Sequence, residues 1–142
     1  MEQEYENRTL AILKPDCIEK KIIGRVISRL ENEGFEIVAG RVCKLTDKEA
    51  EGFYRVHQNK GFFRDLIKFM TSGKVIVLVL QRENAVEKLR EVIGATDPAE
   101  AKEGTIRREF ADNKQNNIIH ASDSPENAKK EISFFFPGYI LI

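Results

Sequence analysis

The sequence predicts an α+β protein with a split βαβ arrangement, in which helices cover one face of a four-stranded antiparallel sheet. Two observations support this prediction. Short segments at residues 9–13, 35–40, 75–80 and 117–119 have the apolar pattern of strands. Segments with apolar residues at helical spacing separate them, in the order strand, helix, strand, two helices, strand, helix, strand, helix. This periodicity predicts the elements but leaves the order of the strands in the sheet open.

The elements of the first half of the chain have clear local signals. The strand at residues 9–13 is short and apolar and ends at Lys14-Pro15, because a proline disfavours continuation of regular structure. Residues 23–30 carry aliphatic side chains at helical spacing, and Gly34 ends that helix. Residues 35–40 alternate as a strand does, and Thr46 with Glu49 forms a capping box that begins a short helix.

The second half contains the most apolar strand. Residues 62–70 are expected to be helical with two apolar faces, and residues 75–80 form an unbroken apolar run that is typical of a central strand buried on both sides. Asn84 is expected to cap the next helix, which ends near residue 93, and residues 94–104 form a loop. Ser124-Pro125 begins the last helix, which runs to about residue 134.

Size and composition favour one domain, residues 1–142, with an ordinary core. The 23 basic and 23 acidic residues cancel, which argues against nucleic acid as the main partner. Two cysteines indicate a reducing compartment. The acidic N-terminus is followed by no apolar run of a signal peptide, and no apolar run is long enough to span a membrane. We therefore expect a cytoplasmic location.

The residues that could take part in catalysis or anion binding lie in three places. His120 stands where a predicted strand ends and a helix is about to begin, and Glu131 on that helix can reach back to fix the tautomer of the imidazole. Lys14 follows the first strand. Arg90 and Arg107 flank the loop at residues 94–104, which carries Thr96, and arginines suit bidentate phosphate contacts.

Each of these features also has a simpler interpretation. A lone histidine is more often structural than catalytic, and single lysines and arginines are usually surface charges. Asp123 and Ser124 are suited to cap a helix whatever else they do. The wide, irregular spacing of cysteines and histidines disfavours a zinc site. Spacing alone therefore supports no more than an α/β domain with a candidate anion site.

Several segments resemble the motifs of the nucleoside diphosphate kinase family. They have the family's order and spacing, and the resemblance extends from about residue 8 to residue 135. The histidine motif combined with the Lys-Pro-Asp motif is highly specific for this family. The segments are residues 8–16 (RTLAILKPD), 62–63 (FF), 72–73 (SG), 94–96 (GAT), 104–107 (GTIR) and 117–124 (NIIHASDS).

The resemblance implies a ferredoxin-like sheet and an enzyme that moves the terminal phosphoryl group of a nucleoside triphosphate to a nucleoside diphosphate. The transfer is ping-pong, through a phosphohistidine, with broad base specificity. His120 matches the nucleophile, and Glu131 and Ser122 match the residues that support it. The residues that match contacts to phosphates and sugar are Lys14, Tyr54, Arg90, Thr96, Arg107 and Asn117, and those under the base are Phe62 and Leu66.

The resemblance also implies a cofactor and an assembly. Mg²⁺ bridges the phosphates and is held mainly by the nucleotide, with no direct protein ligand assigned. The chain is expected to form a homo-oligomer, with a hexamer favoured over a tetramer, and residues 94–116 contribute to subunit contacts and to the nucleotide site. The apolar tail at residues 134–142 is expected to pack against this subunit or a neighbour.

Three positions depart from the family pattern. Ala121 replaces the usual glycine after the histidine, Glu103 replaces a proline before Gly104, and Gly61 replaces a proline before Phe62. The last two changes loosen the chain locally and concern oligomer stability more than chemistry. A binding module with an inactive site, and a protein that binds single-stranded nucleic acid, are the alternatives. An inactive binding module would lack one of the site residues, and here all of them are present. Binding of single-stranded nucleic acid needs a basic stripe, and this sequence has none.

Overall fold

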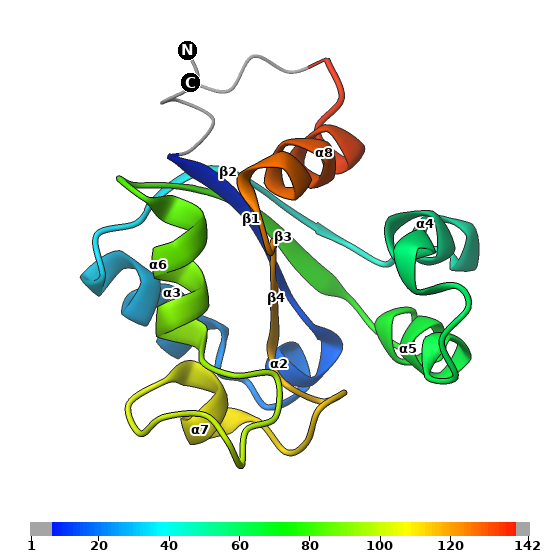
Figure 1. The fold of residues 1–142 in the computed structure, drawn as a ribbon, viewed down its shortest axis with the longest axis horizontal. Helices are drawn as coiled ribbons and strands as arrows, with labels where there is room; N and C mark the ends of the chain where they lie inside the picture. Colours follow the sequence, from blue (N-terminus) through cyan, green and yellow to red (C-terminus); the bar gives the residue numbers. More distant parts are fainter. Residues whose placement is uncertain (1–6, 139–142) are drawn as a thin grey trace.

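A single antiparallel sheet organises the computed structural model, which describes residues 7–138 (Figure 1). Its strands lie in the order β2-β3-β1-β4, and each neighbouring pair is antiparallel. This is the strand order of a ferredoxin-like split βαβ fold, so the predicted fold class is confirmed. The strands are β1 (Arg8–Leu13), β2 (Glu36–Cys43), β3 (Val75–Gln81) and β4 (Ile119–Ala121).

The helices predicted from periodicity are all present, with ends that differ by a few residues. Two short helices and one 3₁₀ turn were not predicted, because elements of five residues or fewer are too short to show a helical period. The helices are α2 (Pro15–Glu19), α3 (Ile23–Asn32), α4 (Asp47–Phe53), η1 (Arg55–His57), α5 (Phe63–Met70), α6 (Ala85–Ile93), α7 (Ile106–Phe110) and α8 (Pro125–Phe135). Within residues 7–138 no helix is long and apolar enough to cross a membrane.

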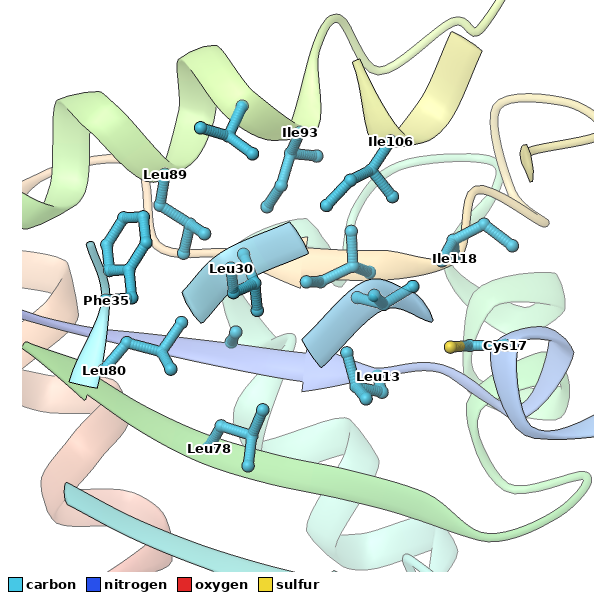
Figure 2. Close-up of a cluster of buried hydrophobic side chains, with 14 of the residues drawn as sticks. Leu13, Cys17, Leu30, Phe35, Leu78, Leu80, Leu89, Ile93, Ile106 and Ile118 are labelled. Carbon is cyan, nitrogen blue, oxygen red and sulfur yellow. The ribbon is translucent and has the colours of Figure 1, made fainter. Parts of the chain in front are cut away.

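Helices cover both faces of the sheet, so the prediction of one covered face is wrong. Ala11 and Leu13 of β1 pack with α3, α6 and Ile106 of α7 in the core shown in Figure 2. Leu10 and Ile12 point to the opposite side and pack with α4, α5 and the end of α8. Successive side chains of a strand face opposite sides, so the apolar runs at residues 10–13 of β1 and 75–80 of β3 require a cover on each face.

The short strand before the last helix lies two residues later than predicted. Ile118 has a positive φ of 77°, which interrupts the extended backbone, and pairing with β1 begins only at Ile119. His120 is therefore the middle residue of β4, opposite Ile12, and not the residue that follows a strand. The sheet itself fixes the backbone of His120.

The helix N-termini confirm two predicted caps and correct a third. Thr46 and Glu49 form the capping box, and Ser124 accepts a hydrogen bond from the Asn127 N–H at 3.1 Å. Asn84 does not cap α6 with its side chain. It adopts a left-handed conformation, φ 55°, and its amide donates to Glu87 at 3.1 Å. The apolar tail was predicted as far as residue 142, and residues 139–142 of it lie outside the described part of the chain.

Candidate active site

His120, Glu131 and Ser122 form a hydrogen-bonded triad between β4 and α8. The Nε2 atom of His120 lies 2.7 Å from Oε1 of Glu131, and the Ser122 hydroxyl donates to the same oxygen at 2.9 Å. Ser122 is fully buried, and the side chains of His120 and Glu131 are about one-fifth exposed. In a neutral ring the Nε2–H donates to the carboxylate, so the proton resides on Nε2 and Nδ1 keeps its lone pair.

Aromatic rings surround this triad. The Phe53 ring meets the His120 ring edge-on at 5.2 Å, and the Tyr54 ring does so at 6.0 Å. Tyr54 is buried, and its hydroxyl oxygen has no hydrogen-bond partner among the described residues. Burial, followed by the charge of Glu131, raises the pKa of Tyr54, which keeps the phenol protonated. A ligand oxygen near His120 would supply the partner that this hydroxyl lacks.

Lys14 is a buried cation at the junction of β1 and α2. Its ammonium donates to Oδ1 of Asn117 at 2.7 Å, and the Asn117 amide donates to the Thr96 carbonyl at 3.2 Å. Burial, and then the charge of Arg107, lowers the pKa of Lys14 to about 8, while Asp16 opposes that change. Lys14, Asn117 and Thr96, which were predicted to act on phosphate and sugar, therefore form one connected network.

Arg107 is held by three backbone carbonyls. Its guanidinium donates to Ile119 at 2.7 Å, to Gly94 at 3.0 Å and to Asn117 at 3.3 Å. Burial, and then Arg90, lowers the pKa of Arg107 to about 10, so it remains a cation at neutral pH. A guanidinium fixed by neutral carbonyls keeps its net positive charge available for an anion.

A cavity of about 320 Å³ opens beside this cation. Arg90, Thr96 and Arg107 line it, and Ala121, next to His120, closes one side. This volume is within the range of small-molecule sites. The methyl group of Ala121, the first departure from the family pattern, therefore borders the cavity, while the other two departures, Gly61 and Glu103, are exposed.

Gly94 allows the loop at residues 94–104 to pack tightly. Its φ is 93°, and a Cβ atom there would lie 2.6 Å from Oγ1 of Thr105. Thr105 in turn caps α7 by accepting from the Arg108 N–H at 3.3 Å. Since the Gly94 carbonyl also accepts from Arg107, this close approach sets the position of the cavity wall.

Phe62 and Leu66 lie apart from the cavity lining, at the start of α5. Phe62 is half exposed, as a surface for a stacked base must be, and Leu66 is partly buried. His57 connects this surface to the triad, since its ring lies 5.6 Å from Phe62 and 6.5 Å from Tyr54. No motif marks His57 in the sequence, and only the fold shows that its ring lies between the two parts.

A metal ion has no protein cage in the described part of the chain. No group of three or more histidine, cysteine, aspartate or glutamate side chains gathers there. Two arginines are the cations of the cavity lining, and Glu91 is its one acidic residue. This donor set does not fit a resident divalent cation, and it does fit the phosphates to which such an ion binds.

The fold and the site together define a class of protein. An imidazole with one nitrogen fixed by a carboxylate, one residue before an alanine that lines a cavity together with two arginines, is suited to take and give a phosphoryl group. This geometry is the one expected of a phosphotransferase.

Comparisons with known proteins identify the family. The nucleoside diphosphate kinase family model matches residues 7–140. A nucleoside diphosphate kinase of Anaeromyxobacter sp. (strain Fw109-5) is 56% identical over 130 residues, which are 92% of this chain and 89% of the relative. That of Salinibacter ruber is 52% identical over 135 residues, 95% of each chain.

Solved structures agree. The Aquifex aeolicus nucleoside diphosphate kinase has a TM-score of 0.92 and 44% identity, covering 96% of this chain and 99% of its own. The Halobacterium salinarum enzyme, solved in complex with CDP, has a TM-score of 0.91 and 34% identity, covering 96% and 91%. The chain belongs to the nucleoside diphosphate kinase family and is a nucleotide phosphotransferase.

Proposed function

We propose that this chain carries the terminal phosphoryl group of a nucleoside triphosphate on Nδ1 of His120 and passes it to a nucleoside diphosphate. The family reaction is ping-pong nucleotide phosphotransfer. The observation that supports His120 is the 2.7 Å contact between His120 Nε2 and Glu131, which leaves Nδ1 free to act as the nucleophile. Sequence motif and geometry therefore support the same residue.

In the first half-reaction the Nδ1 lone pair attacks the terminal phosphorus in line. The bond from that phosphorus to the bridging oxygen breaks, and its electron pair leaves with the nucleoside diphosphate. The ring becomes positively charged, and Glu131 balances that charge through the Nε2–H bond. A second diphosphate then attacks the phosphohistidine, the steps reverse, and the ring returns to its neutral form.

Charge neutralisation and positioning supply most of the catalysis. In this proposal Lys14, Arg90 and Arg107 contact the phosphates, where the transition state spreads negative charge over its equatorial oxygens. The carbonyls that hold Arg107, and the Asn117 amide that holds Lys14, fix these cations before substrate binds. Tyr54 offers its unpartnered hydroxyl and Thr96 its side chain to the same ligand.

The family requires a divalent cation. We propose Mg²⁺, entering as part of the nucleotide complex and bound to phosphate oxygens, because the described side chains form no cage for it. The ion neutralises phosphate charge when it is present. Each step above is carried by groups of this chain.

The base stacks on Phe62 and Leu66 in this proposal. Aromatic stacking tolerates every base, because each base has a π-face. The groups with strong hydrogen-bonding power, such as Lys14, Arg107 and Asn117, are committed to phosphates and sugar, which all nucleotides share. Broad base specificity follows.

We also propose that the chain forms a homo-oligomer, with a hexamer favoured over a tetramer, as expected for a family whose members are generally oligomeric. Ile37 and Val42 are exposed on the edge strand β2, and burial against another copy would remove this apolar surface from water. Light scattering at micromolar concentration tests the assembly, and a monomer would contradict it. A cytoplasmic location remains a prediction from composition.

Label transfer from γ-labelled ATP tests the proposed function. The protein should become labelled, and addition of GDP should move the label to GTP. A His120→Ala variant should fold and bind nucleotide without becoming labelled, whereas His57→Ala should still be labelled. A label that persists in His120→Ala, or one that is stable in acid as phosphoserine is, would reject the assignment.

A further inference from the structure

Ile118 occupies a strained turn immediately before the catalytic strand. Its φ is 77°, and the Ile119 N–H donates to the Asn117 carbonyl at 2.9 Å, which closes a three-residue γ-turn around it. A γ-turn with a positive φ at its centre is rare, and a β-branched residue adopts that φ only under constraint. The fully buried side chain of Ile118 lies in the core of Figure 2, so a surrounding structure must hold this turn in place.

Lys14 and Asp16 bind the backbone of Ile118 at its carbonyl and at its N–H. Oδ2 of Asp16 accepts the Ile118 N–H at 3.0 Å, and the Lys14 N–H donates to the Ile118 carbonyl at 2.9 Å. Asp16 and Ile118 are 102 residues apart in sequence, so the contact joins the first turn of α2 to the residue before β4. A carboxylate that accepts from a backbone N–H makes one of the stronger hydrogen bonds in proteins.

The turn orients the groups that hold the cations. The carbonyls of Asn117 and Ile119, one on each side of Ile118, both accept from the Arg107 guanidinium. The Asn117 side chain accepts from Lys14, and His120 follows one residue after Ile119. A relaxed, extended Ile118 would break the hydrogen bond between the Ile119 N–H and the Asn117 carbonyl. It would also move these two carbonyls apart to the spacing of two residues in a strand, roughly 6.6–6.8 Å.

We propose that Asp16 is a positioning residue for phosphoryl transfer, acting through Ile118: its carboxylate holds the turn that aligns Lys14, Arg107 and His120. This inference rests on the proposed function. It assigns to Asp16 a role beyond that of an acidic residue in the first turn of α2, which would need no burial. Asp16 is only 5% exposed and its partner lies on another element, whereas Asp47 occupies the equivalent first turn of α4 in solvent.

The experiment compares Asp16→Ala, Asp16→Asn and the control Asp47→Ala in the full-length protein. Single-turnover phosphorylation by ATP measures the chemical step, and hydrogen exchange of the Ile118 amide reports on the turn. Asp16→Ala should slow phosphorylation on the order of 10²-fold, the usual effect of a small misplacement of reacting groups, and should accelerate Ile118 exchange. Asp16→Asn keeps an acceptor oxygen and should stay within about tenfold of the wild type, and Asp47→Ala should be unchanged.

A double variant distinguishes a loss of positioning from a general loss of stability in Asp16→Ala. Glycine adopts a positive φ without strain, so in an Ile118→Gly background the removal of Asp16 should slow the reaction much less than it does alone. Full additivity of the two rate effects would overturn the proposal, as would an Asp16→Ala protein that is destabilised but labelled at the wild-type rate. Failure of the wild type to become labelled would instead reject the proposed function.

Discussion

Glu131 accepts hydrogen bonds from both His120 and Ser122 at the same oxygen, Oε1. Because Ser122 is fully buried and donates its hydroxyl at 2.9 Å, it aims that oxygen at the imidazole and keeps it from rotating toward solvent. The tautomer of His120 is therefore set by a carboxylate that is itself held in place.

Replacing Glu131 with glutamine should disable the nucleophile without removing it. A glutamine NH₂ group can donate to Nε2, which would move the ring proton to Nδ1 and block attack. Because general acid–base groups of this kind contribute about 10²–10⁴-fold, we expect a loss of that order in single-turnover phosphorylation. Glu126→Gln, an exposed position on the same helix, is the matched control and should be unaffected. Equal rates for both variants would show that Glu131 does not set the tautomer.

The lowered pKa of Lys14 predicts an alkaline limb in the rate profile. In the proposed function Lys14 binds phosphate in its charged form. Its pKa is about 8, so kcat/KM should fall as the pH rises through that value. A Lys14→Arg variant keeps the charge to higher pH, so its profile, at whatever absolute rate, should stay flat across pH 8. If kcat/KM of this variant declined at the same pH, the decline would have to come from the titration of another group.

The same shift has a consequence for folding. The pKa of Lys14 is lowered in the folded protein from 10.5 to about 8, so between these values the unfolded chain binds more protons. Stability contributed by this group therefore rises with pH across that window, and below pH 8 the cost of burying the charge is fully present. Urea unfolding of the wild type and Lys14→Met should show Lys14→Met relatively more stable at pH 7 than at pH 10. A difference independent of pH would contradict the shift.

Alanine substitutions at two glycines with positive φ, Gly94 and Gly104, allow the cost of backbone strain to be measured separately from the cost of a steric clash. Gly104→Ala meets no atom within 4 Å and should cost roughly 1–2 kcal/mol through its backbone alone. Gly94→Ala adds a clash with Thr105 and should cost about 1–3 kcal/mol more. Because the Gly94 carbonyl holds Arg107, only Gly94→Ala should also lower kcat/KM. Urea unfolding with steady-state kinetics checks both effects, and equal losses in the two variants would remove the argument from close packing.

Base selection should be weak. Phe62→Ala should raise the KM of every nucleotide by a similar factor, because stacking contributes about 1–3 kcal/mol per base whatever the base is. Phe134→Ala, at another half-exposed ring, is the control. Steady-state kinetics with the diphosphates of adenosine, guanosine, cytidine, uridine and deoxythymidine should give kcat/KM values within roughly two orders of magnitude. A ratio above about 10⁴ would reveal a base contact that the described residues do not show.

Much of the fold could be predicted from local sequence patterns, and the errors of that prediction have physical causes. The unbroken apolar run of β3 itself indicates two covered faces, so the prediction of one covered face conflicted with a signal already present in residues 75–80. The displacement of β4 could not be foreseen, because nothing in the residue type of an isoleucine indicates a positive φ. The Ile118 N–H in that conformation donates to Asp16, which lies far away in sequence.

The roles of the site residues could be predicted only through motifs, whereas one contact could be predicted from spacing. Spacing placed His120 and Glu131 within reach, and the 2.7 Å contact agrees with that expectation. The carbonyls that hold Arg107, and the Ile118 carbonyl that accepts from the Lys14 N–H, are backbone groups that contact distant segments. Backbone groups are the same in every residue, so a sequence carries no mark of which carbonyl will accept from which arginine.

The position of the phosphoryl group on the imidazole tests the central claim most directly. Protein labelled with ¹⁵N at histidine and phosphorylated by ATP can be examined by NMR for coupling between phosphorus and each ring nitrogen. The account predicts one phosphohistidine, His120, with phosphorus on Nδ1 and with the Nε2 proton retained toward Glu131. Phosphorus on Nε2, or on His57, would contradict it, because the carboxylate contact could not then define the nucleophile.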